Sequence, residues 1–249
     1  MNLQKNGEKS KMVTGTIVTI AGGILWGVSG VCGQYMFQNK GVTAPWLVSV
    51  RLVVAGLLML CYYFLTDREQ TLAIWKSKRD RRDVIIYGLL GMLPCQYAYF
   101  QTIEWSNAGT ATVIQYLGPA LIVIWVCFRT KRMPTLQEIT GVILAVIGVF
   151  LIATHGNPTS LALSGRALLM GLASAVSVAI YTLEPARLQK KYDTPLILAW
   201  GMTIGGVALT LISRPWTAKG IQADAEMFAA LAFVIVFGLF VFYDFEVFM

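Results

Sequence analysis

The sequence predicts an all-α, polytopic membrane helix bundle, organised as two inverted five-helix repeats with the second incomplete. Three observations lead to this prediction. Hydrophobic residues make up 56% of the 249 residues and charged residues 13%, against about 25% charged residues in a soluble domain. The apolar residues form long runs separated by basic clusters, and the chain matches itself after a shift of 150 residues. Despite the net charge of +7, this composition excludes a soluble enzyme, a disordered chain and a nucleic-acid-binding domain.

Eight apolar runs are long enough to cross a bilayer, because a hydrocarbon core of about 30 Å needs a helix of about 20 residues. Spanning segments must satisfy their backbone hydrogen bonds internally, which makes helices the expected form. The alternating pattern of a membrane barrel is absent from the sequence. In chain order, the expected spans are 13–37, 45–65, 84–102, 108–128, 136–153, 163–183, 195–213 and 227–243.

The Lys and Arg residues between these runs orient the chain, because cytoplasmic loops carry an excess of basic residues. With a cytoplasmic N-terminus, fifteen of them fall on the inner side and four on the outer side, while Arg51 lies within a span. The inner residues occupy the tail 1–12, the loop 66–83 and the segments that follow the fourth and sixth spans. We therefore expect eight helices in the cytoplasmic (plasma) membrane, with both ends inside.

The internal repeat places the first, second and third spans on the sixth, seventh and eighth. In this register Lys40 matches Lys190, Pro45 matches Pro195 and Gly56 matches Gly206. Five spans precede the second copy, so it enters the membrane from the opposite face, as in the inverted repeats of secondary transporters. We divide the chain into a cytoplasmic tail (1–12), a first repeat (13–153) and a second repeat (160–249).

The second repeat lacks counterparts of the fourth and fifth spans, so a complete pair would need ten helices. The match also decays near the end, where Gly238 still aligns with Gly88 but Asp244 faces Pro94. We interpret the chain as a truncated or frame-shifted gene product. A genuine eight-helix protein is the alternative.

Four segments carry a resemblance to a known family: GGILWGVSG (22–30), APWLVSVRLVVAGLLML (44–60), NAGTATVIQYLGPALIVIW (107–125) and GVILAVIGVFLI (141–152). In this order and spacing, the chain resembles the EamA family of the drug/metabolite transporter superfamily from residue 13 to about residue 238. The resemblance implies ten helices around a central cavity, and export or exchange of small metabolites or amino acids across the cytoplasmic membrane. Because the last two helices of that plan are absent, a transport-inactive membrane fragment is an alternative.

Polar side chains on one face of several spans are candidates for the wall of a solvated cavity. Residues three or four apart share a helix face, and polar groups inside a bilayer usually face protein or water. The expected cavity residues are Trp26, Arg51, Tyr97, Gln101, Gln115, Tyr116 and Tyr181. The alternative is helix packing, which we favour for the serines and glycines. The pairs Gly23 with Gly27 and Gly201 with Gly205 predict tight helix crossings first and a homodimer surface second.

Arg51 is the most specific single candidate, since it lies about 9 Å along its helix from Pro45 at 1.5 Å per residue. Three interpretations stay open: it binds a carboxylate or other anionic substrate group, it forms a structural ion pair or dipole cap, or it snorkels to the outer interface. An Arg in this span is a familiar feature of the family that the chain resembles, and this supports substrate binding.

Three further residues bear on energy coupling and motion. Glu184 is a candidate coupling carboxylate if burial raises its pKa, although its position at a helix end favours plain interfacial solvation. Pro94 and Pro119 lie inside spans, where each removes one helical hydrogen bond, so they are candidate hinges. Proline is also well tolerated in membrane helices without such a role.

Other classes of function find little support in the sequence. The only histidine, His155, falls in an expected outer loop, so the GVSG segment 27–30 lacks the base that a serine protease needs. Neither a metal-ligand cluster nor a nucleotide-binding loop is present. We therefore expect no enzyme activity, no cofactor, no metal and no nucleic-acid partner. The expected partners are a small-molecule solute and membrane lipid, and the remaining alternatives are a structural membrane protein and a lipid-linked sugar flippase.

Overall fold

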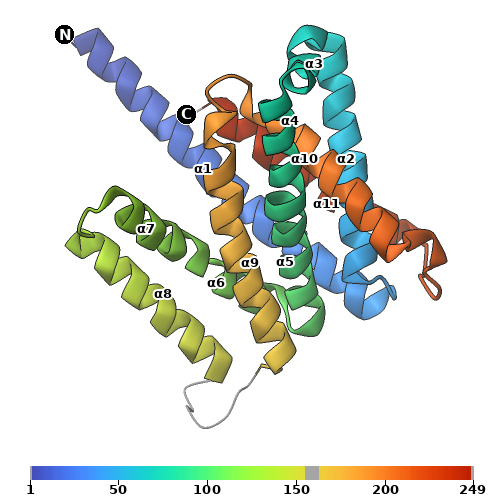
Figure 1. The fold of residues 1–249 in the computed structure, drawn as a ribbon. Helices are drawn as coiled ribbons and strands as arrows, with labels where there is room; N and C mark the ends of the chain where they lie inside the picture. The colour runs from blue at the N-terminus through green and yellow to red at the C-terminus, as the bar shows by residue number, and fades with distance from the viewer. Residues whose placement is uncertain (1, 155–162, 248–249) are drawn as a thin grey trace.

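The computed structural model describes the backbone of residues 2–154 and 163–247, and the side chains of residues 20–154 and 163–236. All regular secondary structure in these ranges is helical (Figure 1). The elements are α1 (Asn2–Asn39), α2 (Ala44–Thr66), α3 (Arg68–Lys76), α4 (Lys78–Ile86), the π-helical η1 (Tyr87–Met92), α5 (Leu93–Trp105), α6 (Ala108–Gln115), α7 (Leu117–Thr130), α8 (Leu136–Thr154), α9 (Gly165–Leu183), η2 (Glu184–Arg187), α10 (Thr194–Ser213), η3 (Pro215–Thr217) and α11 (Ala225–Val247).

Six helical segments in the described ranges are long and apolar enough to cross a membrane: Ile20–Asn39, Ala44–Thr66, Ala108–Thr130, Leu136–Thr154, Gly165–Arg187 and Thr194–Ser213. They correspond to six of the expected spans. The third expected span falls in the continuous helical run of α4, η1 and α5, and the eighth begins in the apolar stretch Ala225–Val236 of α11. The all-helical class is therefore confirmed, whereas the number of eight spans stays a prediction.

Short polar side chains cap the starts of six described helices: α3, α4 and α6, and also α8 (Thr135), α9 (Ser164) and α11 (Asp224). The Asp67 carboxylate accepts from Gln70 N at the start of α3, and the Ser77 hydroxyl accepts from Asp80 N at the start of α4. The Asn107 side chain does the same for Thr110 N at the start of α6, at 2.8 Å. Each contact satisfies a backbone N–H that a helix leaves unpaired in its first turn.

Helices α2 and α10 make the most extensive helix–helix contact among the described residues, and we call them the central pair. Buried side chains from α1, α2, η1, α5, α10 and α11 form one continuous hydrophobic core around it. Gly201 and Gly205 of α10 face this core, where a Cβ on Gly201 would lie 2.5 Å from Tyr87 Cε1 and a Cβ on Gly205 2.8 Å from the Gly88 carbonyl oxygen. The predicted tight crossing at this glycine pair is confirmed.

The other glycine pair behaves differently. A Cβ on Gly23 or on Gly27 would have no heavy atom within 4 Å among the described residues. The prediction of a tight helix crossing at this pair is therefore wrong for the described part of the chain. Small residues permit close approach, but they do not by themselves bring a second helix to the site.

Two helix pairings flank the central pair. Helix α9 packs along α5, and α1 packs along α11. Helices α7 and α8 form a hairpin at one edge of the molecule, where α7 contacts α9 (Figure 1). Most of α8 is exposed, with Val149, Ala153 and Thr154 as its buried residues. The edge hairpin and the face of α9 that it contacts frame the clefts described below.

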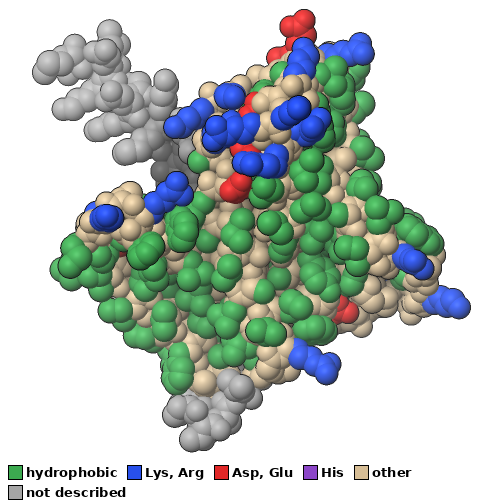
Figure 2. Space-filling view, in the orientation of Figure 1, with side chains coloured by type: hydrophobic (Ala, Val, Ile, Leu, Met, Phe, Trp, Pro, Cys, Tyr) green, Lys and Arg blue, Asp and Glu red, His purple; other side chains and the backbone are tan. Residues whose placement is uncertain are grey.

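Charged and apolar side chains occupy separate parts of the surface. Lys and Arg gather at the end of the molecule formed by α3, α4 and the end of α9, while hydrophobic side chains cover the flank (Figure 2). At the opposite end of α2, Lys40 Nζ contacts Asp224 Oδ2 at 2.6 Å and Glu226 Oε2 at 2.7 Å. These ion pairs tie the α1–α2 connection to the start of α11. An apolar belt between two charged ends is the surface expected of a membrane protein.

Candidate functional site

Arg51 lies inside the helix bundle, with 8% of the residue exposed. Its Nη1 donates to Gln96 Oε1 of α5 at 3.0 Å, and its guanidinium lies 5.2 Å from the centre of the Phe100 ring. Its Nε has no hydrogen-bond partner among the described residues. Burial of this kind argues against snorkelling to the lipid interface, and it leaves substrate binding and a structural role open.

The surroundings of Arg51 are neutral. Tyr99, Cys95 and Tyr181 are the side chains that interact with its charge electrostatically. Removing a guanidinium from water costs several kcal/mol unless an anion or a full set of hydrogen bonds compensates. In the described residues Arg51 has one hydrogen bond and one aromatic face, so its charge is only partly compensated.

Trp26 and Tyr181, two of the predicted cavity residues, approach the same region from other helices. The Trp26 ring of α1 meets the Tyr99 ring edge-on, with centroids 6.4 Å apart. The Tyr181 ring of α9 stacks on Tyr87 of η1 at 5.7 Å. Tyr99 also shares a hydrogen bond of 3.0 Å with the Thr112 hydroxyl of α6. The structure thus brings Trp26 and Arg51 to one face of α5. Tyr181 stacks on η1 and lies near enough to Arg51 to interact with its charge.

That face of α5 carries Gln96, Tyr99 and Phe100, none of which is among the predicted cavity residues. The predicted stripe of Tyr97 and Gln101 lies on the adjacent face. The signal was available, because Gln96 is a polar residue inside an apolar run and Tyr99 and Phe100 follow it at helical spacing. Periodicity identifies both faces and does not decide which of them meets Arg51.

Gln101 takes part in a helix cap. Its Nε2 donates to Glu104 Oε2 at 2.9 Å, and the same carboxylate oxygen accepts from Ala44 N at 2.8 Å. Glu104 therefore compensates both the unpaired N–H and the positive dipole at the start of α2. Tyr97, one turn earlier, packs partly buried against the hydrophobic core. These contacts give both residues a structural explanation.

Gln115 and Tyr116 are adjacent in sequence but have opposite environments. Gln115 is buried, and its Nε2 donates to the Ser174 hydroxyl of α9 at 2.8 Å. Tyr116 is 64% exposed and lies at the interruption between α6 and α7. Gln115 therefore links two helices, and Tyr116 is open to the surroundings.

Both candidate hinge prolines coincide with a departure from α-helical geometry. Pro119 follows the break at Tyr116, and the ring of a helical proline clashes with the carbonyl four residues earlier, here that of Gln115. Pro94 is the second residue of α5, which follows the π-helical segment η1 directly. π-helical turns inside α-helices are often found at functional positions. The structure therefore places a local irregularity at each proline, while motion at these points stays a prediction.

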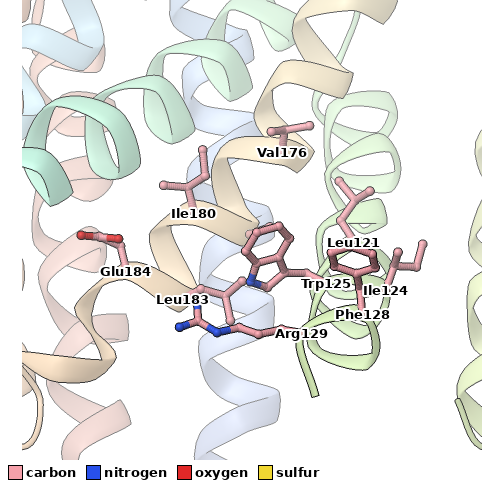
Figure 3. A pocket seen from close by; sticks show the side chains of 10 residues that line it. Leu121, Ile124, Trp125, Phe128, Arg129, Val176, Ile180, Leu183 and Glu184 are labelled. Carbon is pink, nitrogen blue, oxygen red and sulfur yellow. The ribbon is translucent and has the colours of Figure 1, made fainter. Parts of the chain in front are cut away.

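A cleft of about 530 Å³ lies between α7 and α9. Figure 3 shows its two walls and the Arg129 side chain, which extends from α7 toward α9. The cleft is lined by Leu121, Ile124, Trp125, Phe128, Arg129, Val176, Ala179, Ile180, Leu183 and Glu184. Glu184 is the one predicted site residue that it contains, and the Glu184 carboxylate points away from Arg129 (Figure 3).

A second cleft of about 450 Å³ continues the first toward the basic end of the molecule. The two share Trp125, Arg129, Leu183 and Glu184. The second adds Arg79, Arg82, Asp83, Val126, Thr130, Ala186 and Arg187. Together they form one amphipathic cavity with an apolar half along α7 and α9 and a cationic half at the helix ends.

An ion-pair network holds one wall of the cationic half. Arg187 Nη2 contacts Asp80 Oδ1 at 2.6 Å and Asp83 Oδ2 at 2.5 Å. Burial of Asp80 opposes its ionisation, but hydrogen bonds from Arg187, Tyr192 and Lys191 outweigh this effect and lower the pKa of Asp80 to about 2. The network therefore joins α4 to η2 through a permanently charged carboxylate at neutral pH.

Sequence comparison gives consistent results over nearly the whole chain. The sequence profile of the EamA-like transporter family matches residues 13–154 and 165–248. YicL of Salmonella typhimurium, described as an uncharacterized inner membrane transporter, is 36% identical over 227 residues, which cover 90% of this chain and 74% of YicL. An uncharacterized transporter of Archaeoglobus fulgidus is 24% identical over 217 residues, which cover 86% of this chain and 72% of that protein.

A solved crystal structure has a similar fold, with a TM-score of 0.63. The similarity covers 94% of this chain and 78% of the other, at 14% sequence identity. At this identity the similarity concerns the arrangement of the helices alone.

Proposed function

This chain belongs to the EamA-like transporter family, and from this premise we propose that it is a secondary transporter of small metabolites or amino acids. Its relatives are membrane transporters, and six of its described helical segments are long enough to cross a bilayer. It is therefore a multi-pass membrane protein. The proposal adds the solute class, export or exchange as the direction, and the cytoplasmic membrane with a cytoplasmic N-terminus.

The proposed mechanism is alternating access between two inverted repeats, 13–153 and 160–249, after a cytoplasmic tail of residues 1–12. Two helix pairings support it. The shift of 150 residues maps α1 onto α9, and it maps the continuous run of α4, η1 and the start of α5 onto α11. The packing of α9 against η1 and α5 therefore corresponds to the packing of α1 against α11. The irregular backbone at Pro94 and Pro119 supplies the candidate hinges. Glu184, on η2 at the edge of the cleft, is the candidate coupling carboxylate.

The observation that carries the proposed solute class is the incomplete compensation of the Arg51 charge. A buried guanidinium whose Nε has no partner among the described residues can donate charge-assisted hydrogen bonds to a carboxylate. A carboxylate from a metabolite or amino acid would supply the negative charge that the described neighbours of Arg51 do not. Trp26, which contacts Tyr99 of α5, and Tyr181, which stacks on Tyr87 of η1, are the side chains proposed to line the remainder of the solute site, next to Gln96.

The test is solute counterflow with the purified full chain in liposomes, using a panel of radiolabelled amino acids and small carboxylates. We expect saturable uptake of at least one carboxylate above the level of empty liposomes. Arg51→Lys is expected to raise KM at least about tenfold. Lysine keeps the charge but cannot reproduce the planar guanidinium geometry, and a lost hydrogen bond to a charged group costs about 1.5–3 kcal/mol.

Arg81→Gln is the matched control, because Arg81 is an exposed arginine on α4 and is not among the residues that contact Arg51. It should leave KM unchanged. Unaltered flux in Arg51→Lys would remove Arg51 from the solute site. Absence of flux for the whole panel, with a folded protein by thermal unfolding, would favour a transport-inactive membrane protein.

A homodimer is a further element of the proposal. The open face of α1 at Gly23 and Gly27 is a surface that a second copy could contact. Cross-linking between cysteines placed at Gly23 in purified protein tests this, and a monomer at all protein concentrations would contradict it.

A further inference from the structure

The lining of the amphipathic cavity between α7 and α9 changes along its length from apolar to cationic. Its apolar half is lined by large side chains that are themselves partly exposed, among them Ile124, Phe128 and Val176. The opposite half contains four arginines and two acidic residues. Trp125 lies where the two halves meet, as aromatic residues commonly lie at the membrane–water interface.

The arginines of the cationic half differ in how far their charges are compensated. Arg187 is held by Asp80 and Asp83, so it contributes little free charge. Arg82 has one contact of 3.3 Å, to Asp83, and its side chain is 70% exposed. Arg79 and Arg129 are both exposed and form no ion pair with the described residues. The cavity mouth therefore has an excess of positive charge that the described chain does not neutralise.

Arg129 can be compared with Arg132, which lies three residues later on the same side of the molecule. Arg132 forms a bidentate pair with Glu138, at 2.9 and 2.6 Å. Arg129 instead extends across the cavity toward α9 (Figure 3). Its guanidinium thus lies at the boundary between the apolar and cationic halves without an acidic partner.

We propose that this cavity binds one anionic phospholipid from the membrane leaflet on the basic side of the protein. The phosphate contacts Arg129 and Arg82, with Arg79 adjacent, and an acyl chain follows the apolar half past Ile124 and Val176. Basic pockets between membrane helices are known to bind anionic headgroups. A free phosphate would leave the apolar half unused, and a neutral lipid would leave the arginines uncompensated.

The site is separate from the solute site proposed around Arg51. The residues proposed to contact the solute line neither cleft, and Glu184 is the one residue assigned to transport that does. The lipid contacts proposed here do not include Glu184. Failure of lipid binding and failure of solute transport can therefore be told apart by measuring each in the same preparation.

The full chain is placed in nanodiscs of phosphatidylcholine alone or of phosphatidylcholine with phosphatidylglycerol. Native mass spectrometry then measures which lipids stay bound to the protein after it is released from the nanodiscs. We expect one phosphatidylglycerol to be retained preferentially over phosphatidylcholine. Arg129→Gln should weaken this retention about fivefold. Each basic residue near an anionic headgroup contributes about 1 kcal/mol of binding free energy, which corresponds to about a fivefold change in affinity. Val176→Trp should weaken it as well, because the larger ring fills the apolar half while every charge stays in place.

Arg81→Gln is the matched control, since Arg81 belongs to the same basic end but does not line the cavity. It should leave retention unchanged. Equal losses in Arg81→Gln and Arg129→Gln would mean diffuse attraction to the membrane surface and would overturn the proposal. Equal retention of the two lipids would overturn it too. Displacement of phosphatidylglycerol by glycerol 3-phosphate or inorganic phosphate would assign the site to a free anion instead of a lipid.

Discussion

Gly56 of α2 and Gly206 of α10 make reciprocal contacts with each other's helix. A Cβ on Gly56 would lie 2.8 Å from Thr203 N, and a Cβ on Gly206 would lie 2.8 Å from Val53 N. The two glycines are 150 residues apart, and so are Val53 and Thr203. The shift of 150 residues that defines the sequence repeat therefore maps this contact onto itself. Two halves related by a pseudo-twofold axis are expected to show this relation.

Gly206→Ala is expected to destabilise the protein. The added methyl group would meet backbone atoms of α2, which cannot move aside as a flexible side chain can, and overpacking of this kind costs about 1–3 kcal/mol. Thermal unfolding in detergent measures the effect. Gly23→Ala is the matched control, because its Cβ meets no described atom within 4 Å. Equal stability of both variants would contradict the close crossing of α2 and α10.

The hydrogen bond between Gln115 and Ser174 is expected to couple α6 to α9. Its 2.8 Å length and the burial of both residues keep it out of competition with solvent. A double-mutant cycle with Gln115→Met and Ser174→Ala should give a coupling free energy of about 0.6 kcal/mol, the average found for hydrogen bonds inside a membrane protein, and no more than about 1.7 kcal/mol. Additive single-variant effects on unfolding would rule out the interaction.

The ion-pair network of Asp80 is expected to make stability depend on pH in the acid range. The pKa of Asp80 in the folded protein is about 2, below its ordinary value of 3.8. A depressed pKa stabilises the folded state at pH values above the unfolded pKa. Its contribution should therefore be complete above about pH 4 and disappear as the pH falls toward 2.

Asp80→Asn tests this dependence, because the amide keeps the size of the carboxylate without its charge. We expect a lower melting temperature than the parent protein at neutral pH and a smaller difference near pH 2. The measurement is thermal unfolding in detergent across this pH range. A difference that stays constant with pH would show that the charge of Asp80 does not contribute.

Pro119→Ala is expected to slow solute exchange without weakening solute binding. Alanine restores an N–H that can donate to the Gln115 carbonyl, so that α6 and α7 can join into one stiffer helix. Counterflow should then show a turnover several-fold lower at an unchanged KM. Unchanged turnover would mean that the interruption at Tyr116 serves packing alone.

Much of the fold follows from local properties of the sequence. Whether a segment becomes a membrane helix depends on its own length, hydropathy and backbone hydrogen bonds. Accordingly, six of the predicted spans coincide with helices of sufficient length and apolarity. The prolines likewise mark irregular backbone, since the missing N–H of Pro119 and Pro94 acts within one turn of the helix.

The site residues could be predicted only in part. Helical periodicity placed Gln101 and Tyr97 on one face of their helix and left Gln96 on another. It could not indicate that Gln101 would bind Glu104 or that Gln96 would accept from Arg51. Helical spacing places Gln115 and Tyr116 on the same side of one continuous helix, yet the helix break between α6 and α7 separates a buried residue from an exposed one.

The sequence by itself determined the helical class, the membrane location and the family. The tertiary structure decided which faces meet: Gly56 against α10, Arg51 against Gln96, and Arg129 across the cavity toward α9. The physical reason is that hydropathy and periodicity act along one helix. The rotation and crossing of two helices depend instead on side-chain packing between segments far apart in the chain, which neither property encodes.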